Sequence, residues 1–445
     1  MAIINGAEND GRMVLPATTG QHFLWLLGRY RRCRGALGLP VLLRLRGPLD
    51  VGCLEGALDD VAARHPALRT VFAVRDGRLH RVVAPAETAA VALASADVTS
   101  AADPVGAADA QIRDFLRADP DLATGPLRTG RWRIGSDDHL LVLNPHHAVT
   151  DAWSNLVLVR DLAVLYNARR AGSTARLPVL APAEDHEAPA RPTGRPGERA
   201  TARDRLAGLL RGARFPDLAP PVDRAQGQPL ADVEWFGLDR ELTGALEAVA
   251  REAGAGLSVV LLTLFLSVLR EASGQDRVAA CAVRSERTDP RLRDTVGFLA
   301  QTVVVPFTAG PGLGSDPLAA IHEVRDDVRA GLNDRSAWAS LPPNAWAKNG
   351  FGRPEDAVFH LYPDPGDVDP GQCGLTDLTV TPYRQPDGVG SRFELQMVIV
   401  PGRDGLLGSI RFAPDRFSRS MVRGLVAAYR SAAAELAAAR LRRTP

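Results

Sequence analysis

The amino-acid sequence predicts an α/β protein built from two lobes of similar size. The chain has 445 residues, which is more than one ordinary hydrophobic core encloses. Strand-like and helix-like hydrophobic patterns are mixed in both halves. Residues 177–202 interrupt these patterns with five prolines and no periodicity, which is typical of a linker. We therefore expect a first lobe over residues 1–176, a linker over 177–202 and a second lobe over 203–445.

The elements expected in the first lobe follow from hydrophobic periodicity and from turn residues. Asp50 is a suitable N-cap for one helix, and Asp76-Gly77 lies where a hairpin would turn. Asp151 stands at the start of a long helix that continues to about residue 171. The other expected helices span residues 21–31 and 107–118. The expected strands span residues 41–46, 70–74, 79–83, 130–134 and 139–143.

The second half repeats this mixture of strands and helices without an internal sequence repeat. Apolar or alternating runs predict strands at residues 233–238, 278–283, 302–307, 357–362, 378–382, 393–400 and 406–412. Apolar residues at helical spacing predict helices at residues 241–253, 257–273, 316–332 and 416–441. Both halves therefore fit lobes of the α/β class.

Charge and hydropathy exclude several classes of function. The formal net charge is +1 at pH 7, so no overall field favours nucleic acid or an anionic membrane as a partner. The N-terminus lacks the basic and apolar regions of a signal peptide. The most apolar stretch, residues 257–269, is too short to span a bilayer. We therefore expect a cytoplasmic protein without a membrane partner.

The spacing of cysteines and histidines predicts no metal site. The four cysteines are scattered and form no C-x-x-C pair, so neither a zinc site nor a disulfide framework is indicated. Apart from one adjacent pair, the histidines lack metal-ligand spacing. No phosphate-binding or dinucleotide-binding glycine pattern is convincing. We expect neither a metal nor a resident cofactor.

The segment that carries chemistry begins where an apolar strand ends at two adjacent histidines. Residues 140–145 lead into His146 and His147, and after a short turn a helix begins at Asp151. A histidine at the end of a strand is held rigidly by the backbone beside a cavity. Because its ordinary pKa lies near neutrality, it suits a general base.

A purely structural interpretation of the same residues is also open. Asp151 could serve only as an N-cap, with its carboxylate accepting from amides of the first helical turn. His146 and His147 could simply be polar residues at a strand end. A chance His-His-x-x-x-Asp pattern should occur in roughly one such sequence in a hundred. The motif alone is suggestive, and its position between a strand and a helix strengthens it.

Several segments resemble a known superfamily, in the same order along the chain. Residues 146–154 are similar to the HHxxxDG signature of the condensation-domain and CoA-dependent acyltransferase superfamily. Residues 18–26 resemble its S-x-A-Q-x-R-L-W-x-L motif, and residues 64–72 its R-H-E-x-L-R-T-x-F motif. Residues 296–302 resemble I-G-x-F-V-N-T, and Arg287 stands ten residues before the glycine of that segment. The resemblance therefore covers most of the chain.

The resemblance implies a fold and roles for four residues. It implies two chloramphenicol-acetyltransferase-like lobes in a V-shaped arrangement, with an active-site tunnel between them. His147 would position or deprotonate the attacking group, and His146 would support it. Asp151 would be structural, paired with Arg287 across the lobes. Removal of either partner would leave a poorly compensated charge.

The resemblance also implies that Ala152, Trp153 and Ser154 line the tunnel. Here the sequence departs from the family pattern, because Ala152 replaces the glycine of the signature. Its methyl group would narrow the route of a substrate on one side. Pro66 replaces a glutamate and Gln301 replaces an asparagine in the other motifs. These changes bear on which substrates enter more than on the fold.

Within the superfamily, the sequence is most similar to the domains that catalyse condensation. It lacks the E-G-H-G-R-E segment of epimerization domains, and it keeps the histidines that heterocyclization domains replace by aspartates. It also lacks the D-F-G-W-G motif of small and plant-type acyltransferases. The resemblance implies a stand-alone condensation enzyme of nonribosomal peptide type that forms an amide or an ester. The alternatives are a CoA- or carrier-dependent O-acyltransferase and an inactive domain that recruits partners.

The expected partners are a carrier protein and a small-molecule amine or alcohol. The chain has no room for an adenylation or carrier domain and no G-G-x-S attachment segment. The acyl donor would therefore arrive as a thioester, with its phosphopantetheine arm supplied by the substrate. Carrier proteins are commonly acidic. The basic run Arg29, Arg31, Arg32 and Arg34 could dock one, although a solvated helix end explains it equally well.

Overall fold

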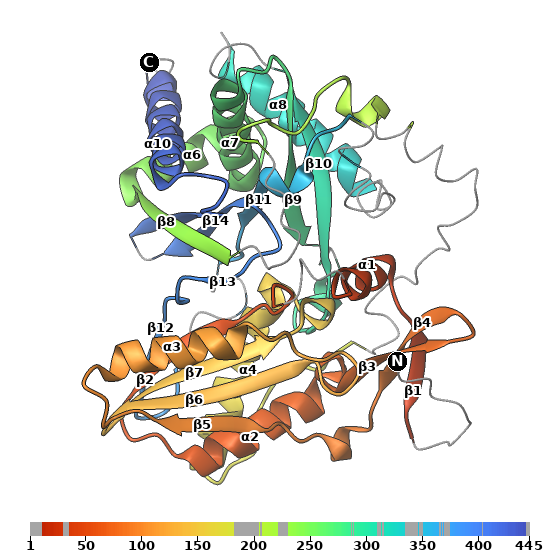
Figure 1. Ribbon diagram of the computed structural model, residues 1–445, viewed down its shortest axis with the longest axis vertical. Helices are drawn as coiled ribbons and strands as arrows, with labels where there is room; N and C mark the ends of the chain where they lie inside the picture. Colours follow the sequence, from red (N-terminus) through yellow and green to blue (C-terminus); the bar gives the residue numbers. More distant parts are fainter. Residues whose placement is uncertain are drawn as a thin grey trace.

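The computed structural model shows two α/β halves, one stacked on the other (Figure 1). It describes residues 11–29, 35–181, 204, 207–220, 230–285, 287, 289–308, 313, 316–333, 346, 350–364, 366, 368, 374–402 and 404–441. Most of the predicted linker, residues 182–202, lies outside this set. So do Arg31, Arg32 and Arg34 of the basic run.

The first half is organised around a sheet of strand order β12-β2-β7-β6-β5, in which the edge strand β12 spans Thr379–Pro382. Its strands from this half are β2 (Val41–Arg46), β5 (Leu93–Asp97), β6 (Leu127–Gly135) and β7 (Asp138–Pro145). Leu43 and Leu45 pack against α2 (Val51–Arg64) and α4 (Ala152–Arg170). Leu42 packs on the opposite face against α3 (Pro104–Leu116). The period of two in β2 thus places helices on both faces.

A smaller sheet of order β1-β4-β3 lies beside this layer. It contains β1 (Met13–Pro16), β3 (Thr70–Arg75) and β4 (Arg78–Val83), and α1 (Thr19–Leu27) follows β1. The predicted hairpin is confirmed, since Asp76 and Gly77 join β3 to β4 with φ of 48° and 71°. Two positive φ values are typical of the tight turns that match the twist of a hairpin.

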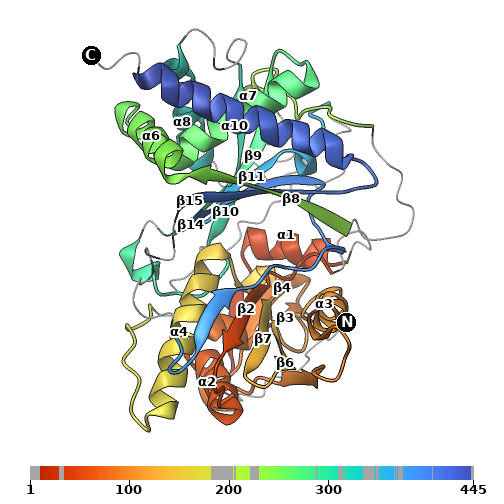
Figure 2. The ribbon, with the colours of Figure 1, turned by 90° about the vertical axis from the view of Figure 1, so that its left-hand side faces the viewer.

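The second half is built on a sheet of order β10-β9-β11-β14-β15-β8-β13. The strands are β8 (Leu230–Asp239), β9 (Val278–Ser285), β10 (Ala300–Phe307), β11 (Val358–Leu361), β13 (Val389–Gly390), β14 (Leu395–Gly402) and β15 (Gly405–Phe412). The helices are α6 (Arg240–Glu252), α7 (Leu257–Ser273), α8 (Pro317–Asn333) and α10 (Arg419–Leu441). Figure 2 shows these helices on the face turned away from the first half.

Short 3-10 turns occupy residues Pro66–Arg69 (η2), Ala86–Thr88 (η3), His147–Val149 (η4), Pro290–Leu292 (η6) and Pro354–Asp356 (η7). Every helix and strand expected from the sequence is present, within a few residues of its expected ends. Three strands were not expected. β5 has an Ala-Ser-Ala centre with little apolar contrast, and β1 and β13 are very short.

Strand β12 (Thr379–Pro382) comes from the second half of the sequence but joins the sheet of the first half. It pairs antiparallel with β2. Beyond it, the Tyr383 amide donates to the Leu42 carbonyl over 2.9 Å, and the Tyr383 hydroxyl donates to Asp109 of α3 over 2.9 Å. The assignment of all of residues 203–445 to the second lobe does not hold for β12. The backbone of β12 pairs with β2 and so forms an edge of the first sheet.

Within the described residues, no single helix combines the length and the apolarity needed to cross a membrane. The bent pair α6 and α7 meets those criteria only when its two helices are taken together.

We expect Tyr383→Phe to lower the free energy of unfolding by about 1–2 kcal/mol. The substitution removes the hydrogen bond to the Asp109 carboxylate that joins the segment after β12 to α3. Urea denaturation would measure the change. Asp109→Ala removes the same bond, so the double variant should be little worse than the poorer single variant. Fully additive losses would show that the bond contributes nothing to stability.

Candidate active site

Backbone hydrogen bonds fix the two histidines at the end of β7. The His146 amide donates to the Pro126 carbonyl, and the His147 amide donates to the Leu37 carbonyl, both over 2.7 Å. On the next turn, η4, the Gln21 side chain of α1 donates to the Ala148 carbonyl over 3.2 Å. Three hydrogen bonds to distant parts of the chain therefore fix the backbone around His147.

The hydrogen bonds of the imidazoles give the two histidines opposite tautomers. Nδ1 of His147 lies 2.9 Å from the Thr150 carbonyl oxygen, which only accepts, so Nδ1 carries the proton. Its Nε2 is then left with a lone pair. Nδ1 of His146 accepts from the Ala148 amide over 3.0 Å, so the proton of His146 is on Nε2.

Both imidazoles are neutral at physiological pH. Burial, together with the positive charge of Arg392, lowers the pKa of His147 to about 3. Burial and the neighbouring His147 lower the pKa of His146 to about 3. The ring of Phe298, from the second half, meets the ring of His147 edge-on with 5.3 Å between centroids. His147 is therefore a neutral hydrogen-bond acceptor that an aromatic ring holds in place.

The predicted ion pair between Asp151 and Arg287 is present at the junction of the two halves. Arg287 Nη1 lies 2.6 Å from Asp151 Oδ2, and both side chains are almost fully buried. Oδ2 also accepts from the Leu299 amide over 3.1 Å. Oδ1 accepts from the amide of Ser154 over 2.7 Å, as an N-cap does. The two interpretations of Asp151 therefore both hold, one for each carboxylate oxygen.

Ser154 completes this network. Its hydroxyl lies 2.8 Å from Asp151 Oδ1 and accepts from Arg287 Nη2 over 2.8 Å and from the Gly297 amide over 3.1 Å. Burial alone would raise the pKa of Asp151, but Arg287 and Ser154 hold it below its usual value. The carboxylate therefore stays ionised, and the start of α4 is tied to residues of the second half.

The expectation that Ser154 lines a tunnel is wrong. Its side chain has no exposed surface, and its hydroxyl is engaged by Asp151, Arg287 and Gly297. Trp153 is partly exposed and donates from its indole nitrogen to the Arg293 carbonyl over 2.7 Å. Ala152 is 6% exposed. For Ala152 and Trp153, a place in the tunnel wall stays a prediction.

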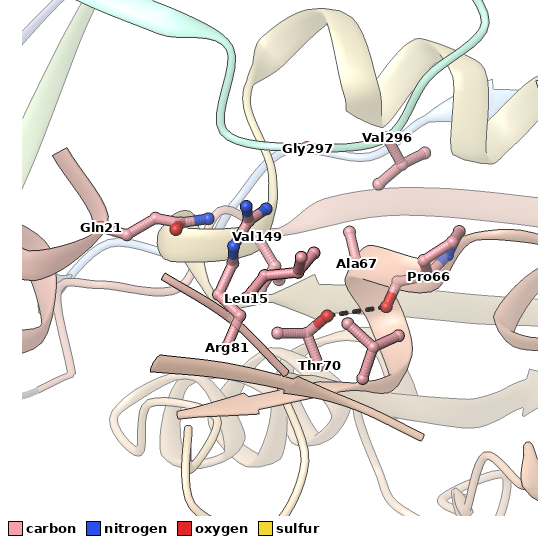
Figure 3. Close-up of a pocket in the computed structure, with 10 residues that line it drawn as sticks. Leu15, Gln21, Pro66, Ala67, Thr70, Arg81, Val149, Val296 and Gly297 are labelled. Atoms are coloured by element: carbon pink, nitrogen blue, oxygen red, sulfur yellow. Dashed lines mark hydrogen bonds between the residues drawn. The ribbon is translucent and has the colours of Figure 1, made fainter. Parts of the chain in front are cut away.

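A pocket of about 360 Å³, including its mouth, adjoins the histidine segment (Figure 3). Val149, two residues after His147, and Gly297, next to Phe298, belong to its wall. The remaining lining residues come from the small sheet, α1, η2 and the loop before Gly297; they are Leu15, Gln21, Pro66, Ala67, Thr70, Arg81, Val83 and Val296. Both halves of the chain thus contribute to a pocket that borders the segment after His147.

Two residues of the second half that sequence reasoning missed, His360 and Arg392, lie within electrostatic reach of the groups at the site. The rings of His360 and Tyr362 lie 4.5 Å apart at the end of β11. Burial lowers the pKa of His360 to about 3, and Asp151 and Arg392 also act on it. His360 was expected to be a surface or packing residue. Nothing in the sequence around Arg392 indicates that it lies near His147.

Among the residues that the structure describes, no group of three or more histidines, cysteines or carboxylates is placed to hold a metal ion. Arg29, the one described member of the basic run, has its guanidinium carbon 3.3 Å from the centroid of the Trp25 ring. Docking of a carrier protein at this run stays a prediction.

Comparison with known proteins decides the family. A model of the family described as "Condensation domain" matches residues 12–337. The chain belongs to the condensation-domain family. This condensation domain is 36% identical over 310 residues to a probable non-canonical nonribosomal peptide synthetase, CymA, of Salinispora arenicola, and 32% identical over 334 residues to an isonitrile lipopeptide synthase of Mycobacterium tuberculosis. These matches cover 66% and 71% of this chain but only 4% and 13% of the relatives.

Solved structures show the same fold. The first condensation domain of the calcium-dependent antibiotic synthetase has a TM-score of 0.71, with 20% identity and coverage of 96% of this chain and 97% of that one. SgcC5 of Streptomyces globisporus has a TM-score of 0.68, with 21% identity and coverage of 95% and 98%. The predicted fold class, two chloramphenicol-acetyltransferase-like α/β lobes, is therefore confirmed.

We expect Arg287→Gln to lower the free energy of unfolding by about 3–5 kcal/mol at pH 7, because it leaves the Asp151 carboxylate buried without its cation. Without Arg287, burial raises the pKa of Asp151 above its unfolded value. The loss should therefore grow as the pH rises through that raised pKa and shrink toward pH 4.

Denaturation of both proteins at pH 4, 5.5 and 7 would test this dependence. Arg291→Gln, which removes an exposed arginine paired with Asp289, is the matched control and should change little. An Arg287→Gln effect that is the same at all three pH values would contradict the role of the buried charge.

Proposed function

We propose that this domain catalyses condensation, with His147 holding the attacking group. The observation that carries the proposal is the tautomer of His147: Nδ1 donates to the Thr150 carbonyl, which leaves the Nε2 lone pair for an incoming N–H or O–H. The donor would be an acyl thioester on the phosphopantetheine arm of a carrier protein. The acceptor would be a small-molecule amine or alcohol, and the product an amide or an ester.

The reaction needs one nucleophile and one leaving group. The N–H or O–H of the acceptor donates to Nε2 of His147 while its nitrogen or oxygen attacks the thioester carbon. The carbonyl oxygen becomes an oxyanion in the tetrahedral intermediate. Collapse of the intermediate re-forms the carbonyl and breaks the carbon–sulfur bond. The thiolate leaves and takes up the proton, which gives the amide or ester and a free pantetheine thiol.

The low pKa of His147 determines its role in this reaction. An imidazole with a pKa of about 3 is a weak base toward a free amine or alcohol. It accepts a hydrogen bond well, and it takes the proton only once attack has made the nucleophile acidic. We therefore propose that His147 mainly positions the nucleophile. A hydroxyl and an amine are served equally by this geometry, so amide and ester formation share the same site.

The relatives support the proposal through their names. They include an isonitrile lipopeptide synthase and phosphinothricin tripeptide synthetase PhsC of Streptomyces viridochromogenes, which is 33% identical over 345 residues. That match covers 74% of this chain and 30% of PhsC. A role in the biosynthesis of peptide-like secondary metabolites is therefore the biological setting that we propose.

We expect His147→Ala to abolish product formation, a loss of about a hundredfold or more. The test incubates the protein with acyl thioesters on carrier proteins and on pantetheine mimics, offers amines and alcohols, and detects products by mass spectrometry. His322→Ala, on α8, is the control and should keep full activity. Equal product from wild type and His147→Ala would remove His147 from the mechanism. A folded wild type that binds a carrier but forms no product would favour recruitment without catalysis.

We expect no loss of activity near pH 6.5 on the acid side, because the pKa of His147 is lowered to about 3 and the imidazole stays neutral. Values of kcat/KM between pH 5 and 8 would be measured with an alcohol acceptor, which does not ionise in this range. With an amine acceptor, the rate would be corrected for the fraction of free amine. A fall in kcat/KM centred near pH 6.5 would contradict the proposed state of His147.

A further inference from the structure

The segment of residues 35–39 pairs with the end of β7 and with the histidines that follow it. The Leu39 amide donates to the Pro145 carbonyl over 2.9 Å, and the His147 amide donates to the Leu37 carbonyl over 2.7 Å. The bridge between the two segments is antiparallel. Residues 35–39, all of which the structure describes, form neither a helix nor a strand of their own. The backbone of His147 is therefore fixed only as well as this segment is.

Asp119, which follows α3, binds three backbone amides of this segment. Its Oδ2 accepts from the Gly35 amide over 2.5 Å. Its Oδ1 accepts from the Leu37 amide over 2.7 Å and from the Gly38 amide over 3.1 Å. Hydrogen bonds from an amide to an ionised carboxylate are shorter and about twice as strong as those between neutral groups. One half-buried side chain thus anchors a segment that contains two glycines.

A single peptide group joins Asp119 to His147. The peptide between Leu37 and Gly38 donates from its N–H to Asp119 and accepts the His147 amide at its carbonyl oxygen. Hydrogen bonds in such a chain polarise one another, so the loss of the first weakens the second. Removal of the Asp119 carboxylate would therefore loosen the bond that holds the His147 backbone.

The same segment also acts on the imidazole of His147 through two side chains. Asn155 donates from Nδ2 to the Leu39 carbonyl over 3.0 Å, and its Oδ1 accepts from the Thr150 hydroxyl over 3.0 Å. Thr150 supplies the carbonyl oxygen that lies 2.9 Å from Nδ1 of His147. A shift of residues 35–39 would therefore disturb both the backbone of His147 and the group that sets its tautomer.

Asp119 is itself held by regular elements of the first half. Arg128 of β6 donates from Nη1 to the Ala118 carbonyl, the residue before Asp119, over 2.7 Å. The Leu122 carbonyl, three residues after Asp119, accepts from the Phe72 amide of β3 over 2.7 Å. The carboxylate therefore stands on a part of the chain that two strands fix, and it transmits their rigidity to residues 35–39.

We propose that Asp119 is a positioning residue of the active site, which holds residues 35–39 in place and, through them, the imidazole of His147. This inference rests on the proposed function. A misplacement of about 1 Å in a group that orients a reactant can lower a rate by about a hundredfold. Asp119 should therefore affect the rate of the reaction more than the binding of the acyl donor.

The kinetic test compares Asp119→Ala and Asp119→Asn with wild type. Asparagine keeps one acceptor oxygen for the amides of Leu37 and Gly38, whereas alanine keeps none. We expect Asp119→Ala to lower kcat by about tenfold or more, with KM for the acyl thioester within about twofold of wild type. Asp119→Asn should restore most of the lost kcat. Asp103→Ala is the matched control, because Asp103 accepts from the Gly106 amide at the opposite end of α3. It should lower the melting temperature and keep kcat.

Nitrogen-15 NMR of the histidine side chains gives a second readout that needs no turnover. The spectrum of His147→Ala identifies the signals of His147. In Asp119→Ala, the Nδ1 and Nε2 signals of His147 should shift or broaden, because the bond from Nδ1 to the Thr150 carbonyl is disturbed. Asp119→Asn and Asp103→Ala should keep the wild-type signals.

The outcomes separate this inference from the proposed function. Wild-type kcat and unchanged His147 signals in Asp119→Ala would overturn the inference while condensation itself stands. An equal loss of kcat in Asp103→Ala would also overturn it, because any loosening of the fold would then suffice. No product from wild type would count against the proposed function, and the NMR comparison would still decide the role of Asp119. If Asp119→Ala does not fold, Asp119→Glu, which keeps the charge but moves both oxygens by one methylene, replaces it with the same expected results.

Discussion

The buried ion pair between Asp151 and Arg287 is the interaction on which the rest of the site depends. It joins the start of α4, in the first half, to a residue that follows β9 in the second. The same carboxylate caps α4 and accepts from the Leu299 amide beside Phe298. One side chain therefore sets the position of the helix after the histidines and of the loop that packs on His147. A shift of the two halves relative to each other would disturb both at once.

The surroundings of His146 and His147 give these side chains pKa values and tautomers that their residue type alone does not predict. A solvent-exposed imidazole titrates near neutral pH, whereas the buried His146 and the half-buried His147 stay neutral because water is restricted around both rings and the charge of Arg392 disfavours protonation. Their opposite tautomers follow from one carbonyl and one amide of the same turn. The turn η4 therefore decides which nitrogen faces a substrate. This favours a role in positioning over one in storing a proton.

The second half contributes aromatic and charged side chains to the site. Phe298 packs on the ring of His147, Arg287 holds Asp151, and the positive charge of Arg392, on the segment after β12, also lowers the pKa of His147. The crossover that carries β12 into the first sheet anchors this segment at its other end. The connection between the halves thus also anchors the segment that carries Gln385 and Arg392.

Most helices and strands, and the candidate catalytic histidine, could be predicted from the amino-acid sequence, whereas β1, β5 and β13 could not. Periods of 2 and 3.6, the Asp-Gly turn and the Asp151 cap are local signals, so strands and helices such as β2, α7 and the β3–β4 hairpin could be located from residues that are neighbours in the chain. The motifs likewise pointed to His147 and to the pairing of Asp151 with Arg287. The enclosure of Ser154, the crossing of β12 to the other sheet and the influence of Arg392 on His147 became evident only from the three-dimensional arrangement. These depend on strand order, register and burial, which join residues more than a hundred positions apart and leave no local pattern.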